Sequence, residues 1–347
     1  MKNKISQAIV NLGLAFSQAA SPSDSISENA QLLVQAAEDS FFKNPWFTRG
    51  NVLKCYSAWG VALTPEKIEE FTSRYHKNQG DHNTKTIGII SAGNIPFVGL
   101  HDILCCLFSG HRALIKLSGR DADLTSLIIN ILEQLEPSLK GMVTIAEDRL
   151  TQFDAIIATG SNNSSRYFEY YFAKYPHIIR KNRNGVALLN GNESKEELAL
   201  LGNDIYQYFG LGCRNVAKIF VPKGYNLATL FEAIEPWNGI INHSKYANNY
   251  SYNRALWLID LAPHLDTGFM LFRRDTSFVS PIATLFYEEY EELEQIIQFL
   301  NLNIEQLQCV VSNIEQVPIR VNFGQTQQPE LWDFADGVDT MKFLETI

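Results

Sequence analysis

The chain has 347 residues and a formal net charge of −9 at pH 7. This length predicts about two domains with ample core. The acidic balance argues against nucleic-acid binding through a broad basic surface, so an anionic ligand would need a local pocket. No apolar run reaches about 18 residues, and we therefore expect no membrane span.

Cysteine usage points to a reduced compartment. The five cysteines, Cys55, Cys105, Cys106, Cys213 and Cys309, contain no C-x-x-C pair, so structural zinc and thioredoxin-like chemistry are not expected. An odd, scattered set suits cytosolic thiols. Residues 1–20 show no signal-peptide pattern. We expect a cytoplasmic protein with Cys105 and Cys106 in its core.

The first part of the chain, residues 1–84, reads as a helical N-terminal region. Surface helices are expected over 4–17 and 28–39, and Thr64-Pro65-Glu66 is typical of a helix start. The polar stretch from His76 to Thr84 marks a boundary.

Strands and helices alternate over residues 85–190. Strands are expected at 86–90, 113–116, 142–145, 154–159 and 185–189, with helices at 100–108, 121–135 and 165–174. Their near-continuous apolar runs favour a Rossmann-type parallel sheet covered on both faces. Ligands of such sheets bind at the carboxyl ends of the strands, where Asn94, Lys116 and Gly160-Ser161 fall.

Residues 191–320 predict a second α/β domain, and 321–347 a tail that packs back on the domains. Ser194 and Glu197 have the spacing of a capping box at a helix start. Strands are expected at 216–221, 255–259, 268–272, 282–286, 310–312 and 320–322, with an acidic helix over 290–300.

Cys213 lies between the first helix and the first strand of this second domain, on the turn Gly210-Leu211-Gly212-Cys213. The glycines leave room for a substrate to approach the sulfur. A buried cysteine on a tight turn is the structural alternative. The pair Gly210-x-Gly212 is no dinucleotide fingerprint, because the third glycine is missing and the turn runs from helix to strand.

Five short motifs follow one another along the chain: Asn94-Ile95-Pro96, Lys116-Leu117-Ser118, Thr159-Gly160-Ser161, Gly210-Leu211-Gly212-Cys213 and Phe278-Val279-Ser280-Pro281. With these motifs the chain from about residue 86 onward resembles the aldehyde dehydrogenase superfamily, and within it the LuxC family of fatty acyl-CoA reductases from bacterial bioluminescence. The helical front end matches only loosely.

The resemblance implies a role for each of the first four motifs. Cys213 would attack a thioester carbonyl, and Asn94 with the Cys213 backbone N–H would form an oxyanion hole. Lys116 and Ser118 would contact the adenine-side ribose region, and Gly160 and Ser161 the pyrophosphate. The structural alternatives are a turn asparagine, a solvated lysine and an ordinary helix N-cap.

Two departures from the superfamily refine this interpretation. Residues 177–184 contain no carboxylate where hydrolytic relatives carry a general-base Glu, which favours thioester reduction over aldehyde oxidation. The same stretch contains three basic residues, Arg180, Lys181 and Arg183. They form either a solvated basic patch or side chains that help to bind anionic ligands. Gly119, followed by Arg120, stands where NAD-selective relatives often carry a Glu that binds the ribose 2′-hydroxyl. This suits NADPH, whereas Asp121 and Asp123 argue against it, so NADH stays possible.

The expected enzyme reduces a fatty acyl-CoA or acyl-protein thioester to the aldehyde through a thioacyl-enzyme on Cys213. NADPH is the cofactor and coenzyme A is part of the substrate. The alternatives are a CoA-independent aldehyde dehydrogenase, an acyl-phosphate reductase of the same fold, and a non-catalytic subunit of an acyl-transfer complex. We expect a homo-oligomer that meets acyl-activating or acyl-transferring enzymes. His101 could assist proton transfer, and Tyr206, Tyr208 and Phe209 could line an acyl channel, although a core role suits them all.

Overall fold

The computed structural model describes residues 2–21, 23, 25–75, 83–119, 122–147 and 149–347. The chain forms two compact units. The first holds Met1–Asn182 together with Gln328–Ile347, and the second holds Arg183–Gln327. The helical region expected over 1–84 and most of the expected tail thus lie in the first unit. The division into four functional regions at 84, 190 and 320 stays a prediction.

The first unit opens with helices whose starts are capped by side chains. Their bounds are α1 Lys2–Ala20, α2 Glu28–Lys43, α3 Arg49–Ala62 and α4 Pro65–Ser73. Ser27, Thr48 and Thr64 each accept a backbone N–H in the first turn of α2, α3 and α4. The start of α4 agrees with the predicted helix start at Thr64-Pro65-Glu66, whereas α3 was not predicted. Gly60 lets α1 and α3 approach closely, since a Cβ there would lie 2.3 Å from Ser17 Oγ.

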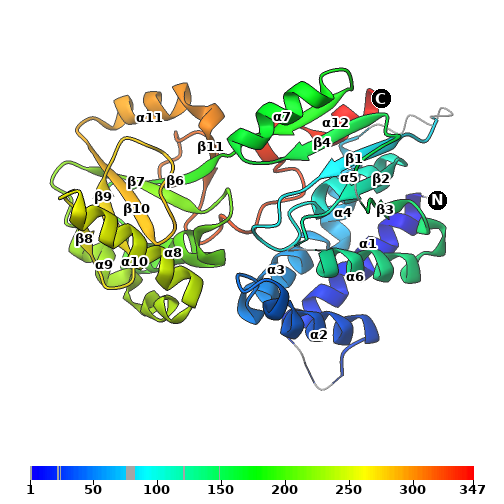
Figure 1. The fold of residues 1–347 in the computed structure, drawn as a ribbon, viewed down its shortest axis with the longest axis horizontal. Coiled ribbons are helices and arrows are strands. Elements are labelled where there is room, and N and C mark those ends of the chain that lie inside the picture. Colours follow the sequence, from blue (N-terminus) through cyan, green and yellow to red (C-terminus); the bar gives the residue numbers. More distant parts are fainter. Residues whose placement is uncertain (1, 22, 24, 76–82, 120–121, 148) are drawn as a thin grey trace. The chain divides into compact units, whose positions relative to one another are not determined.

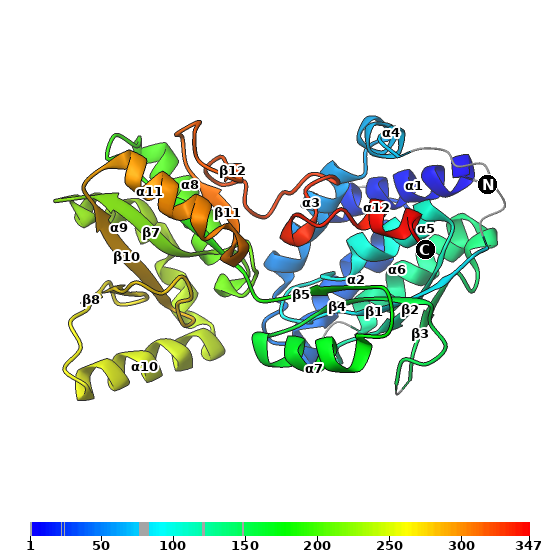
Figure 2. The same ribbon diagram turned by 90° about the horizontal axis from the view of Figure 1, so that it is seen from above.

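A five-stranded parallel sheet follows, in the order β3-β2-β1-β4-β5. Its strands are β1 Thr86–Ile90, β2 Arg112–Lys116, β3 Val143–Ile145, β4 Ala155–Thr159 and β5 His177–Arg180. Helices α5 (Leu100–Ser109) and α6 (Ala122–Leu135) cover one face, and α7 (Asn162–Phe172) covers the other (Figures 1 and 2). The strand order reverses between β1 and β4, which is the usual ligand position of such a sheet.

The last segment of the chain returns to this unit. It contains the helix α12 (Thr340–Glu345), which packs against α5. His111 joins the two, because its Nε2 lies 3.1 Å from the carbonyl oxygen of Leu344.

The second unit is built on a seven-stranded sheet in the order β12-β11-β6-β7-β10-β9-β8, parallel except for the pair β8–β9. The strands are β6 Asn184–Leu188, β7 Val216–Pro222, β8 Leu265–Asp266, β9 Leu271–Arg274, β10 Thr284–Tyr290, β11 Leu307–Val311 and β12 Arg320–Val321. The helices are α8 Lys195–Tyr206, α9 Leu227–Ile234, α10 Ser244–Ile259 and α11 Leu293–Leu302. Among the described residues of both units, short 3-10 turns span Pro137–Leu139, Gln207–Gly210, Glu235–Asn242, Ile304–Gln306 and Ala335–Gly337.

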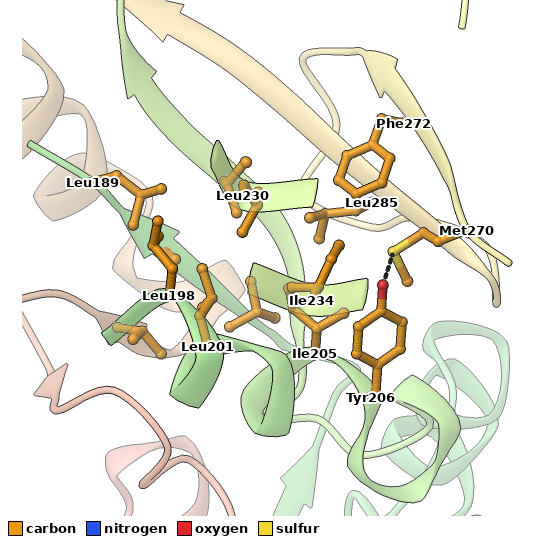
Figure 3. Close-up of a cluster of buried hydrophobic side chains, with 14 of the residues drawn as sticks. Leu189, Leu198, Leu201, Ile205, Tyr206, Leu230, Ile234, Met270, Phe272 and Leu285 are labelled. Atoms are coloured by element: carbon orange, nitrogen blue, oxygen red, sulfur yellow. Dashed lines mark hydrogen bonds between the residues drawn. The ribbon is translucent and has the colours of Figure 1, made fainter. Parts of the chain in front are cut away.

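Helices α8 and α9 bury their apolar faces on one side of this sheet. Figure 3 shows Leu198, Leu201 and Ile205 of α8 beside Leu230 and Ile234 of α9, all buried. On the opposite side, Ile296 and Leu300 of α11 pack on Phe220 and Val310. The capping box predicted for α8 is present, with Ser194 and Glu197 bonded to each other's backbone N–H.

The strand predicted over 255–259 is wrong, because these residues form the end of helix α10. Tyr246, Asn253 and Trp257 are the buried residues of this helix, at helical spacing, while Leu258 and Ile259 are exposed. A short apolar run does not by itself distinguish a strand from a helix end. The strands predicted at 268–272 and 282–286 exist but begin later, at Leu271 and Thr284.

Among the described residues, no helix is long and apolar enough to cross a membrane. In the same part of the chain, no group of three or more His, Cys, Asp or Glu side chains is arranged to hold a metal ion.

Candidate active site

Asn94 lies in the first unit, on the loop that joins β1 to α5, and is half-buried. The loop is held tightly on both sides. The Cys55 thiol lies 3.7 Å from the carbonyl oxygen of Pro96, and a Cβ on Gly99 would lie 3.0 Å from the Cβ of Ser91. Phe97 has a φ of +60°, a conformation that non-glycine residues rarely adopt. Asn94 is therefore part of a constrained loop at the point where the strand order reverses.

Lys116 ends β2 and Ser118 lies two residues further on, at the same edge of the sheet, and both are half-buried. The Lys116 ammonium donates an exposed hydrogen bond to the backbone carbonyl of Glu147, 3.1 Å away. Gly119 is exposed, and a Cβ there would meet no atom within 4 Å. Arg120 and Asp121, which enter the NADPH prediction, lie outside the described residues.

Gly160 and Ser161 follow β4 and begin α7. Ser161 is the N-cap of this helix, and its Oγ accepts a hydrogen bond from the Ser164 backbone N–H at 3.2 Å. A Cβ on Gly160 would lie 2.8 Å from Ser164 Cβ and 2.9 Å from Phe168 Cε2. Only glycine therefore lets α7 start so close to the strand end. The N-cap role is observed, and a pyrophosphate contact stays a prediction.

Arg180 ends β5 and is buried, so neither role considered for it from the sequence is correct. Its guanidinium donates to both carboxylate oxygens of Asp102 on α5, at 2.6 and 2.8 Å, and to the hydroxyl of Thr340 at 3.0 Å. Burial lowers the pKa of Arg180, but the Asp102 carboxylate more than offsets this, and the net pKa shift is upward. Arg180 thus holds β5, α5 and the C-terminal segment together.

The neighbouring basic residues also have protein partners. Lys181 is exposed and pairs with Glu169 at 2.8 Å, as expected of a solvated patch. Arg183 reaches the carbonyl oxygens of Ile304 and Leu307, at 3.4 and 3.3 Å, in the second unit.

The first unit also contains the core residues that the sequence singled out. Cys105 and Cys106 are fully buried, and burial raises the pKa of both thiols. This confirms their predicted core position. His101 places Nε2 2.8 Å from the carbonyl oxygen of Leu331, and burial lowers the pKa of the imidazole. Proton transfer by His101 has no support in this geometry.

Cys213 lies in the second unit and is the one exposed cysteine of the five. It follows a run of left-handed residues, with φ of +54° at Tyr208, +59° at Phe209 and +75° at Gly210. The two non-glycine residues cost roughly 1–3 kcal/mol each in such a conformation. Helix α8 therefore ends at Tyr206, before this run.

Asn215 holds this turn together through its buried side chain. Its Oδ1 accepts a hydrogen bond from the Gly212 backbone N–H at 2.8 Å, and its backbone N–H donates to the Gly212 carbonyl at 3.0 Å. Its Nδ2 donates to the carbonyls of Asp204, Ile205 and Gln207, at 3.0, 3.4 and 2.8 Å. These carbonyls belong to the end of α8, where the helix has no partner of its own for them.

A second set of bonds reaches the turn from the loop after β12. The buried carboxylate of Asp204 accepts the backbone N–H groups of Gly324 and Thr326, at 2.6 and 3.0 Å. Arg214 Nε then donates to the Thr326 carbonyl at 2.6 Å. Burial raises the pKa of Asp204 to about 6, against the lowering effect of these hydrogen bonds and of Arg214. The Cys213 turn is thus tied to α8 both directly and through this loop.

The sheet beside the turn also requires a small residue. A Cβ on Gly185 of β6 would lie 2.5 Å from the carbonyl oxygen of Arg214.

The aromatic residues near the turn pack in the core, which is the alternative to an acyl channel that the sequence also allowed. The Tyr206 hydroxyl lies 3.3 Å from Met270 Sδ (Figure 3), and its ring stacks on Trp237. Phe209 lies against His243, with ring centroids 4.2 Å apart.

The predicted site residues therefore form two groups. Asn94, Lys116, Ser118, Gly160 and Ser161 lie at the carboxyl edge of the first unit's sheet, and Cys213 lies on its turn in the second unit. The oxyanion pair of Asn94 and Cys213 stays a prediction. Sequence reasoning missed Asn215 and Asp204. Two signals in the sequence could have pointed to them. Asn215 is a polar residue directly before the strand at 216–221, and Asp204 is an acidic residue within the apolar face of α8.

No protein-family model matches the sequence, and no curated protein matches it. Among solved structures, aldehyde dehydrogenase 21 from Physcomitrella patens superposes with a TM-score of 0.63 at 11% identity, over 97% of this chain and 84% of that one. The NAD-dependent aldehyde dehydrogenase of Sinorhizobium meliloti gives 0.58 at 12% identity, over 89% and 71%. An aldehyde dehydrogenase of Mycobacterium tuberculosis, complexed with NAD+, gives 0.56 at 12%, over 84% and 71%.

The chain therefore has an aldehyde dehydrogenase-like α/β fold, with one parallel sheet and a second, mixed sheet. This confirms the predicted fold class. Identities of this size establish the fold alone.

Proposed function

We propose that this protein is an acyl-thioester reductase of the LuxC type, which converts a fatty acyl-CoA or acyl-protein thioester to the aldehyde with a nicotinamide cofactor. The observation that carries the proposal is the Cys213 turn. The other four cysteines are buried, whereas Cys213 is exposed on a strained turn that a dedicated set of hydrogen bonds holds. Exposure and a fixed backbone are what a nucleophilic thiol needs.

The surroundings of β5 support thioester reduction over aldehyde oxidation. Residues 177–184 contain no carboxylate, and both carboxylate oxygens of Asp102, which meets the end of this strand, are bound by the Arg180 guanidinium. A carboxylate held in this way is a poor general base for water. A thioacyl group on Cys213 would therefore exchange with a thiol such as coenzyme A more readily than it would hydrolyse.

The first unit fits a dinucleotide at the carboxyl edge of its sheet. The turn at Gly160 has no room for a Cβ, the start of α7 presents backbone N–H groups, and the Lys116 side chain extends from the end of β2. Lys116 and Ser118 would hold the ribose region, and Gly160 and Ser161 the pyrophosphate. A nicotinamide bound here would supply a hydride. Exposed Gly119 puts no carboxylate beside the ribose, which favours NADPH.

In the proposed reaction the Cys213 thiolate attacks the thioester carbonyl carbon, and a new C–S bond forms. The Asn94 amide and the Cys213 backbone N–H stabilise the oxyanion. The adduct collapses, the coenzyme A thiolate leaves and takes up a proton, and the acyl group stays on Cys213. Once the carbonyl carbon has received the hydride, the second oxyanion collapses to the aldehyde and the free Cys213 thiolate.

The test is a panel of acyl thioesters assayed with NADPH and with NADH, on wild type and on Cys213→Ser. We expect aldehyde from wild type and less than a few per cent of that activity from the variant, because a hydroxyl without a base is a much poorer nucleophile than a thiolate. Labelled oxygen from water in an acid product would show a CoA-independent aldehyde dehydrogenase instead. Turnover of acyl phosphate would show an acyl-phosphate reductase, and failure of iodoacetamide to label Cys213 would favour a non-catalytic subunit.

A further inference from the structure

The turn that carries Cys213 lies between the 3-10 turn Gln207–Gly210, which follows α8, and the start of β7. The 3-10 turn contains the left-handed residues Tyr208, Phe209 and Gly210. Beside Cys213, the Leu211 N–H donates to the Tyr208 carbonyl at 3.1 Å and the Asn215 N–H donates to the Gly212 carbonyl at 3.0 Å. Both bonds join residues that are close together in the chain, and neither of them reaches α8.

The Asn215 side chain makes the connection to α8. It is 2% exposed, and both ends of its amide are used. The amide oxygen accepts a hydrogen bond from the backbone N–H of Gly212, the residue before Cys213. The amide nitrogen donates to the carbonyls of Asp204, at the end of α8, and of Gln207, the residue before the left-handed run. One rigid amide plane thus connects both sides of the nucleophile turn to one helix end.

We propose that Asn215 is a positioning residue that sets the place of the Cys213 sulfur for acyl transfer. This inference rests on the nucleophilic role proposed for Cys213 and assigns to Asn215 no contact with the substrate. A side chain that only filled space would not need a donor and an acceptor at these two places. Gly212 fits the same arrangement, because a Cβ there would lie 2.9 Å from Asn215 Oδ1.

The test uses Asn215→Asp, which keeps the size and the acceptor oxygen but removes the donor to the helix end. Asn253→Asp is the matched control. Asn253 is also buried in this unit, and its Nδ2 donates to the Ile282 carbonyl at 2.9 Å, away from the Cys213 turn. If Asn215→Asp fails to fold, Asn215→Ser, which keeps one hydroxyl donor, takes its place.

Acylation of Cys213 is measured directly, as the burst of p-nitrophenolate from p-nitrophenyl acetate, which needs neither nicotinamide nor coenzyme A. Thioester reduction is measured beside it. We expect Asn215→Asp to slow the burst and to lower kcat about a hundredfold, with KM changed less than about threefold, as for a misplaced reacting group. The melting temperature should fall no further than in Asn253→Asp, and that control should keep the wild-type burst.

The outcomes separate the two proposals. A burst in wild type without any thioester reduction would overturn the proposed function, and loss of that burst in Asn215→Asp would still support the positioning role. A wild-type burst rate in the Asn215 variant, or equal losses in both variants, would overturn the positioning role alone. A burst in wild type that Cys213→Ser leaves unchanged would remove the nucleophile and the positioning role with it.

Discussion

Replacing Arg180 by Met should strongly destabilise the first unit. The two side chains of the Arg180–Asp102 pair are 6% and 3% exposed, so water cannot replace either partner. The Met side chain fills a similar space without charge. It leaves the Asp102 carboxylate buried without a cation, and it removes the bond to the Thr340 hydroxyl.

The size of the effect follows from this burial. Removing one partner of a buried ion pair costs about 3–5 kcal/mol, because the other charge stays uncompensated. That is a large part of the roughly 5–15 kcal/mol by which a typical domain is stable. The double variant Arg180→Met with Asp102→Leu has no buried charge and should regain most of the loss. Lys181→Met is the control, since Lys181 pairs with Glu169 at the surface and its loss should cost less than about 1 kcal/mol.

The assay is urea unfolding by circular dichroism, with hydrogen exchange of the β1 and β4 amides as a probe of the first unit. A two-unit chain need not unfold in one step, so the exchange data decide. If Arg180→Met lowers the free energy of unfolding no more than Lys181→Met does, the buried ion pair does not stabilise the first unit. If the double variant is no more stable than Arg180→Met alone, the loss does not come from an uncompensated Asp102 charge.

Three further predictions concern the site. Asn94→Ala should lower kcat for thioester reduction by about two to three decades with little change in KM, because an oxyanion donor acts mainly in the transition state; a change in KM alone would make Asn94 a binding residue. Gly119→Glu should lower the ratio of kcat/KM with NADPH to kcat/KM with NADH by about ten- to a hundredfold and leave iodoacetamide labelling of Cys213 unchanged. If the ratio does not change, neither Gly119 nor Lys116 lies at the ribose. Burial raises the pKa of Asp204 from 3.8 to about 6, so between these values the native state keeps a proton that the unfolded chain releases. The free energy of unfolding should therefore fall as the pH rises from about 4 to 7. In urea unfolding over this range, Asp204→Asn should show a smaller fall of the free energy of unfolding with pH than wild type.

Local patterns in the sequence carried the fold class and most of the elements. Residues 87–89 and 155–158 are buried without alternation, and burial on both faces leaves a strand few choices other than a parallel sheet. The capping box at Ser194 and the proline after Thr64 place helix starts within one residue, because caps act on the neighbouring backbone. The strand predicted to end at Lys116 does so, whereas the helix predicted from 165 begins at Asn162.

What the sequence alone determined is therefore what depends on neighbours in the chain, and long-range partners decided the rest. Nothing near Arg180 in sequence indicates that Asp102 and Thr340 will enclose it, so a buried ion pair looked like a basic patch. The run 255–259 became a helix end because Trp257 packs on Leu271 and Phe286 of the second sheet. The hydrogen bonds of Asn215 depend on the end of α8 lying beside it, because carbonyls at a helix end need a donor from outside the helix. Burial and hydrogen-bond partners belong to the assembled structure, and residue spacing along the chain does not contain them.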